Sequence, residues 1–230
     1  MPSEPTAPKR GHGQVTRRAL VGELTMSFAK VGSEARRLVM GGRLTGLDNS
    51  RVLVAGLVAA IACELEGGVL LLCENRCAYP AAALARQLVE VEYVAWASSR
   101  APEEAHEWLT STREQRFARW QPSQIRRRSN GLFPNTDYPD HCEQGGHATP
   151  NGAREILDNR DLWTEVCLYE AALHGANTWH YLWEAFAAVG VIEEIEFAHL
   201  VVDQAIARWR RFDPFIQAPK APEGPADTTP

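Results

Sequence analysis

The residues best suited to chemistry gather in one polar segment, which runs from Arg126 to Gly152 and is punctuated by Gly and Pro. A phenol, two imidazoles, a thiol and a carboxylate lie within ten residues of one another there. These residues are Tyr138, His141, Cys142, Glu143 and His147. An imidazole changes charge near neutral pH, so His147 is a candidate general base that Glu90 or Glu143 would orient. The alternative is structural, with His147 locking the loop through a bond to the backbone or to Glu90.

Three consecutive arginines, Arg126, Arg127 and Arg128, open this segment. Three neighbouring guanidinium groups suit the binding of a phosphate, as in RNA or a nucleotide. A run of like charge is also typical of a solvated helix face, and that alternative stays open.

A second candidate pair, Arg86 and Glu90, is four residues apart and therefore shares a helix face. Such a pair would hold the His147 loop, bind an anionic ligand, or form a structural salt bridge. The candidate catalytic set is thus Arg86, Glu90, Tyr138, His141, Cys142 and His147.

Metal binding is a further alternative. Two Glu-x-x-His pairs match the spacing found in four-helix di-iron proteins, which also need one Glu from each of two other helices. The residues concerned are Glu103 with His106, Glu196 with His199, and Glu64 and Glu170 as the added carboxylates. A zinc site from Cys73 and Cys77 with His141, Cys142 or His147 lacks the two tight ligand pairs that structural zinc favours. We therefore expect no metal and no cofactor.

One long helix carries a polar stripe, formed by Trp163, Cys167, Glu170, His174, Asn177 and Tyr181. Such a stripe lines a polar pocket or belongs to the core with a satisfied buried pair. The chain has neither a G-x-x-x-x-G-K nor a G-x-G-x-x-G element, which disfavours an NTPase or a nucleotide-dependent dehydrogenase.

The apolar positions that must support these residues follow helical spacing almost throughout. Helices are expected at 15–41, 50–76, 81–100, 103–120, 122–129, 158–189 and 192–212. We predict an all-α fold, a multi-helix bundle with an irregular polar loop, in one domain over residues 15–212. Residues 1–14 and 213–230 are rich in proline and are predicted to be disordered tails.

Particular residues mark the helix ends. Gly41-Gly42 and Gly190 suit the left-handed conformation that ends a helix. Asp48, Asn49 or Ser50 would cap the second helix, and Asp158 or Asn159 the sixth. Pro80, Pro102 and Pro122 suit the first turns of three others.

The composition, with 45% hydrophobic and 23% charged residues, is that of a globular protein. A net charge of −5 argues against coating of nucleic acid, although a local basic patch can still bind phosphate. An odd number of cysteines, five, and a polar N-terminus predict free thiols in a reducing cytoplasm. The most apolar run, residues 52–63, is too short to span a bilayer, so no membrane association is expected.

Two segments carry a family resemblance: the helix with Arg86-x-x-x-Glu90, and the Tyr138…Cys142…His147-x-x-Pro150 loop. Over residues 75–190 the chain resembles a bacterial family of helical proteins of unknown function, which is similar to the HEPN superfamily of nucleotide-binding and RNase domains. Many HEPN domains act in toxin–antitoxin and phage-defence systems. No predicted helix carries the Arg and His spacing of catalytic HEPN ribonucleases, so that motif does not transfer.

Two functions of different class follow. The first is a helical module without its own catalysis, acting as a homodimer or through a protein or RNA partner in a stress, toxin–antitoxin or phage-defence response. The second is an RNA- or nucleotide-directed hydrolase with His147 as base and the arginine run on the phosphate. A di-iron or zinc bundle is the remaining alternative.

Overall fold

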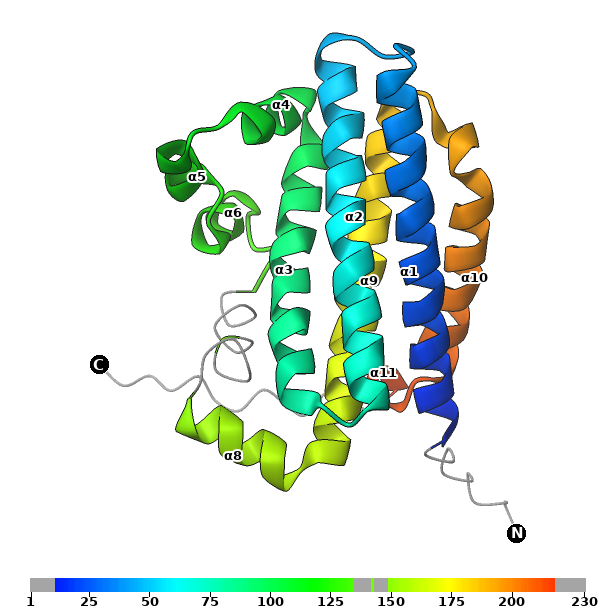
Figure 1. Cartoon of the computed structure of the whole chain (residues 1–230), viewed down its shortest axis with the longest axis vertical. Coiled ribbons are helices and arrows are strands. Elements are labelled where there is room, and N and C mark those ends of the chain that lie inside the picture. Colours follow the sequence, from blue (N-terminus) through cyan, green and yellow to red (C-terminus); the bar gives the residue numbers. More distant parts are fainter. Residues whose placement is uncertain (1–10, 135–141, 143–148, 218–230) are drawn as a thin grey trace.

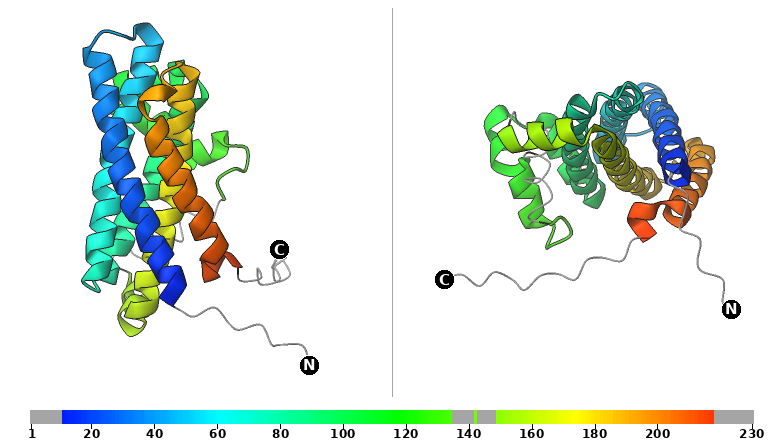
Figure 2. Two further views of the ribbon diagram at one scale, coloured as in Figure 1. Left: turned by 90° about the vertical axis from the view of Figure 1, so that its right-hand side faces the viewer. Right: turned by 90° about the horizontal axis from the view of Figure 1, so that it is seen from below.

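The computed structural model describes residues 11–134, 142 and 149–217, and within these ranges it contains helices and no strand. The all-α prediction is confirmed. Four long helices form the bundle: α1 (Gly11–Met40), α2 (Gly46–Glu74), α3 (Ala78–Arg100) and α9 (Arg160–Ala188). The helices α1, α3 and α9 run in one direction and α2 runs in the opposite direction. In Figure 1, α1, α2 and α3 lie side by side and α9 lies behind α2. A fifth helix, α10 (Glu196–Phe212), follows the 3-10 turn η2 (Ile192–Glu194) and packs along α1 (Figure 2).

Shorter helices extend the bundle on one side and at one end. Beside α3 lie α4 (Pro102–Thr110), α5 (Arg113–Arg119) and α6 (Pro122–Arg128). The end of the bundle carries α8 (Pro150–Asp158) and α11 (Pro214–Gln217).

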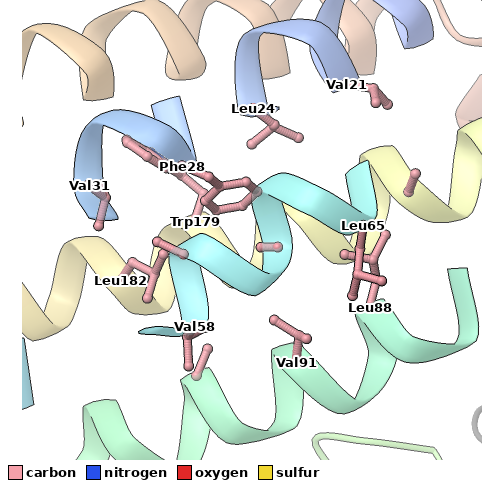
Figure 3. Close-up of a cluster of buried hydrophobic side chains, with 14 of the residues drawn as sticks. Val21, Leu24, Phe28, Val31, Val58, Leu65, Leu88, Val91, Trp179 and Leu182 are labelled. Carbon is pink, nitrogen blue, oxygen red and sulfur yellow. The ribbon is translucent and has the colours of Figure 1, made fainter. Parts of the chain in front are cut away.

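The core forms where the apolar stripes of the four long helices meet (Figure 3). Phe28 of α1 and Trp179 of α9 have ring centroids 5.9 Å apart, and both side chains are buried. A second, smaller apolar cluster joins α3 to the α6 region through Tyr93, Ile125 and Phe133. Because this cluster is separate from the main core, the short helices have an anchor of their own.

Glycine sets the distance between α1 and α2. A Cβ atom on Gly56 would lie 2.5 Å from the Cβ of Ala35, and one on Gly32 would lie 3.6 Å from the Gly56 carbonyl oxygen. The backbones therefore approach too closely for a side chain at Gly56. The same contacts fix which residues of the two helices lie at the same height, with Gly32 near Ala60 and Thr25 near Gly67.

Several predicted helix ends are confirmed. Gly42 has φ of +66° and Gly190 has φ of +72°, and each follows the last turn of a helix. Pro102 and Pro122 occupy the first turns of α4 and α6.

Other boundaries differ from the prediction. The cap of α2 is Thr45 rather than a residue in 48–50, because the helix begins four residues earlier than expected. The helix predicted at 103–120 breaks at Ser111, since Thr112 exchanges hydrogen bonds with Gln115 in a capping box that starts α5. The helix predicted at 158–189 is in fact preceded by α8, and the chain turns at Asn159 (Figure 1).

The segment 213–217 was predicted to belong to a tail but is ordered against α1. Asp213 is fully buried and accepts hydrogen bonds from Arg17, with Arg17 Nη2 at 2.7 Å from Oδ1. Trp209 Nε1 donates to the same carboxylate at 2.7 Å, and the Arg17 guanidinium lies over the ring of Phe215. A buried ion pair thus fixes the C-terminal turn to the first helix.

Among the described helices, α2 is long and apolar enough to cross a membrane by length and composition. The apolar run of 52–63 is thus part of a 29-residue helix. Half of its most apolar window is buried within the bundle.

Candidate functional site

The predicted pair Arg86 and Glu90 is present on α3, where Arg86 Nη1 donates to Glu90 Oε1 at 2.6 Å. Arg86 is mostly covered and Glu90 is about half exposed. The pair lies at the edge of a shallow pocket of about 300 Å³ between α2 and α3, whose apolar wall includes Leu65 and Trp108. An ion pair beside an apolar wall suits a ligand that is mainly apolar with a polar group.

For most of the other predicted site residues, the structure gives no position relative to Arg86 and Glu90. Tyr138, His141, Glu143 and His147 lie outside the described residues, and Cys142 is described only as half-buried with a free thiol. The contact between His147 and Glu90 therefore stays a prediction.

The arginine run forms the last turn of α6, and its members have different environments. Arg128 is bound by Glu104, with Nη1 3.0 and 2.8 Å from the two carboxylate oxygens, and its guanidinium lies 5.1 Å from the ring centroid of Trp120. Arg127 is exposed and donates to Gln124. Glu104 also pairs with Arg119, so one carboxylate serves two arginines. The binding of a phosphate by the three arginines stays a prediction.

The run belongs to a larger basic region, residues 100–130, which we call the basic arm. It contains seven arginines and four glutamates, a formal charge of +3, so the rest of the chain carries −8. Four of its arginines are exposed and form no ion pair with described residues. They are Arg100, Arg113, Arg116 and Arg127.

Aromatic side chains are interleaved with these charges. The Arg113 guanidinium lies 5.7 Å from the ring centroid of Phe117, whose side chain is 55% exposed. A hollow of about 370 Å³ lies where the arm meets α3, between Trp96, Arg100 and Asn130. Guanidinium groups beside aromatic faces suit stacked bases and phosphates.

The nominated di-iron ligands lie within the described ranges, and there they do not converge on one point. His199 stacks on Trp183 with ring centroids 3.7 Å apart, accepts a hydrogen bond from Trp179 Nε1 at 3.3 Å, and has Nε2 3.3 Å from Asp203. His106, in the middle of α4, has Nδ1 3.1 Å from the hydroxyl of Ser50 near the start of α2. Over the described ranges, no group of three or more His, Cys, Asp and Glu residues is arranged to hold a metal ion.

A different set of ionisable residues does converge, in the core between α2, α3 and α9. We call it the acid–histidine cluster, and it consists of Glu66, Glu92, Glu170 and His174. His174 Nδ1 lies 2.5 Å from Glu92 Oε2, and Nε2 lies 3.3 Å from Glu170 Oε2. Asn177 Nδ2 donates to the other oxygen of Glu92 at 3.0 Å. The predicted stripe of α9 thus contains a bonded buried pair, as one of its two interpretations expected.

Burial and neighbouring carboxylates shift the pKa values of His174 and Glu66 in this cluster. Burial opposes the charge of His174, but the carboxylates of Glu170 and Glu92 beside its ring outweigh burial and raise the pKa of His174 to about 10. Glu66 is completely buried against Gly175, and neither carboxyl oxygen has a hydrogen-bond partner among the described residues. Burial raises the pKa of Glu66 well above 4.5, against a weaker attraction from His174. The surroundings thus favour a proton on His174, held by carboxylates, and a proton on the carboxyl group of Glu66.

Glu66 and Glu92 were not identified as site residues from the sequence, although a signal was present. Glu66 is in phase with Ala59, Ala62 and Val69 on the buried face of α2. Glu92 is likewise in phase with Leu88 and Ala95. A carboxylate on the apolar stripe of a helix is a sign of a buried polar partner.

A cavity of about 820 Å³ lies at the end of the bundle, with one side formed by Pro214 and Phe215. Three arginines line it, and each faces an acid. The pairs are Arg17 with Glu165, Arg18 with Glu74, and Arg76 with Asp161. Because the positive and negative side chains of these three pairs offset one another, the lining favours neither an anionic nor a cationic ligand.

No family model, curated protein or solved structure matches the chain. The resemblance to the HEPN-like family stays a prediction from the Arg86-x-x-x-Glu90 helix and the His147 loop.

Proposed function

We propose that the protein is a helical module that binds nucleic acid, with RNA as the expected partner, through the basic arm. The observation that carries this proposal is the separation of charge, +3 on residues 100–130 against −8 on the remainder. Phosphate binding is electrostatic and does not need a protein of net positive charge, only a local basic surface.

The basic arm has exposed arginines that are available to bind phosphate, and this supports the arm as the binding surface. Arg100 and Arg127 are exposed and free of carboxylate partners among the described residues, so they can bind phosphate without first breaking an ion pair. Arg119 and Arg128, in contrast, are held by Glu104 and fix the shape of the arm. The exposed ring of Phe117 offers a surface for base stacking.

The test is fluorescence anisotropy with a labelled single-stranded RNA over a range of salt concentrations. We expect Arg100→Glu and Arg127→Glu each to weaken binding about tenfold and to make the salt dependence shallower by about one to two ions, because contacts to phosphate are lost.

Arg36→Glu on α1 is the matched control, since it makes the same charge change at an exposed position outside the arm. Equal weakening by all three substitutions would mean that only net charge matters, and the arm would not be the binding surface.

The hydrolase alternative rests on His147, and a role in toxin–antitoxin or phage-defence systems rests on the family resemblance. The same RNA assay separates binding from hydrolysis. RNA that is cleaved by the wild type and stays intact with His147→Ala would favour the hydrolase.

A further inference from the structure

We propose that the protein forms a two-fold symmetric homodimer through the outward faces of α1 and α2. We call this surface the α1–α2 face. On α1 it comprises Val15, Ala19, Gly22, Met26, Ala29 and Ser33, and on α2 it comprises Leu57, Ile61, Glu64 and Leu71; Gly68, in the same register, faces Leu84 of α3. Both sets follow spacings of four and three residues, so each lies along one side of its helix.

The α1–α2 face is apolar where a solvated helix pair would be charged. Val15, Met26 and Leu71 are 67%, 61% and 60% exposed, and Leu57 and Ile61 are also exposed. Glu64 is the one charged residue in the two stripes. Exposed apolar side chains that form one continuous surface are typical of an interface.

The shape of the face points to a second copy as its occupant. On α1, Gly22 lies between the exposed side chains of Val15 and Met26, and nothing lies within 4 Å of a Cβ atom built on it. The missing side chain leaves a gap between these two residues, which we call the groove. On α2 the large side chains of Leu57, Ile61 and Leu71 form a ridge. The contact of Thr25 with Gly67 places Gly22 at about the height of Leu71.

A two-fold axis parallel to the helices, between α1 and α2, brings each groove onto the ridge of the other copy. Because this rotation keeps residues at the same height, Leu71 of one copy faces Gly22 of the other. It also places Glu64 of each copy on α1 of the other, so the two carboxylates do not meet. The face is complementary to itself in shape and avoids like charges.

The size of the face is sufficient for a specific dimer. The α1 stripe is about 27 Å long at 1.5 Å per residue, and two packed helices are about 20 Å wide. The face therefore offers on the order of 500 Å² per copy, or about 1,000 Å² in total, which is the lower limit for a specific interface.

The test is sedimentation velocity of the full chain over a wide range of concentrations. We expect a monomer–dimer equilibrium, and we expect Gly22→Glu and Leu71→Glu each to raise the dissociation constant about tenfold or more. Gly22→Glu meets open space in the monomer, so circular dichroism should show an intact fold. The combination Gly22→Lys with Leu71→Glu places opposite charges at the predicted contact and should restore dimerisation relative to Leu71→Glu.

Leu200→Glu is the matched control, because Leu200 is 54% exposed on α10, outside the α1–α2 face. A wild-type chain that is monomeric at every concentration, or a dimer lost equally with Leu200→Glu, would overturn the proposal. Binding of the monomer to phosphatidylcholine vesicles, lost with Leu71→Glu, would overturn it in favour of a bilayer as the occupant of this face.

Discussion

Glu66 and His174 lie in the same core, yet their surroundings favour different charges: burial keeps the proton on Glu66, and carboxylate partners keep it on His174. The folded protein keeps the proton of Glu66 at pH values where the unfolded chain releases it, because burial raises the pKa of this carboxyl well above 4.5. The contribution of Glu66 to stability is therefore complete below about pH 4.5 and is lost as the pH rises towards the folded pKa. We expect Glu66→Met to raise the free energy of unfolding by about 1–3 kcal/mol near pH 8, and by less near pH 4.

Urea denaturation at the two pH values measures this difference. Glu193→Met is the control, since Glu193 is exposed and lies outside the core and the α1–α2 face, and its effect should stay within about 0.5 kcal/mol. An equal gain from Glu66→Met at both pH values would contradict the protonation argument.

The imidazole of His174 has the opposite balance, because its carboxylate partners outweigh burial and raise its pKa to about 10. The pKa of His174 in the folded protein is higher than the ordinary value of 6.5. The stabilising effect of the charged imidazole is therefore complete below pH 6.5 and is lost as the pH rises through about 10. We expect His174→Gln to lower the free energy of unfolding by about 3–5 kcal/mol near pH 6, because Glu92 is left buried without its cation.

The loss should shrink as the pH approaches 10, which thermal unfolding across that range would show. The double variant Glu92→Gln with His174→Gln should recover part of the stability, because it removes the uncompensated charge. A loss from His174→Gln that is the same at every pH would mean that packing, rather than charge, is responsible.

For individual residues, the sequence predicts side-chain pairs that are close along the chain and misses pairs that are far apart along it. Arg86 and Glu90 were paired correctly because a separation of four residues fixes their distance on any helix. Glu92 and His174 are 82 positions apart, and only the packing of α3 on α9 brings them together.

Between elements, the buried pair of Arg17 and Asp213 determines how the C-terminal segment joins the bundle. Both side chains are buried, at 2% and 0% exposed. We expect Asp213→Ala to lower the free energy of unfolding by about 3–5 kcal/mol, because the guanidinium loses its buried carboxylate.

Asp161→Ala is the matched control for this urea measurement. Asp161 forms an exposed pair with Arg76 at 2.5 Å, so its removal should cost less than about 1 kcal/mol. Similar losses from the two substitutions would show that burial of the Arg17 pair adds no stability.

Glycine and proline made the helix ends near Gly42, Gly190, Pro102 and Pro122 predictable, since their backbone preferences are local. The break at Thr112 was missed because a capping box competes with a helical pattern that is otherwise continuous. The C-terminal turn was missed because prolines at 214 and beyond suggest a tail, whereas the stabilising partner is far away on α1.

For the whole molecule, the all-α class could be predicted from the spacing of apolar residues, and the arrangement of the helices could not. Short connections indicate that α1, α2 and α3 are neighbours in that order. Nothing local indicates that α9 lies behind α2 or that α10 packs on α1, because these contacts depend on faces that several helices share.

The uneven charge of the molecule has a consequence for how it approaches other bodies. Because residues 100–130 carry a net charge of +3 and the rest of the chain a net charge of −8, the chain has a permanent dipole moment. In the field of a polyanion it turns before contact, so collisions begin with residues 100–130 and the acidic bundle is held away. Salt screens this orienting force, whose range is about 8 Å at physiological ionic strength. Beyond that distance the molecule approaches a polyanion in random orientations.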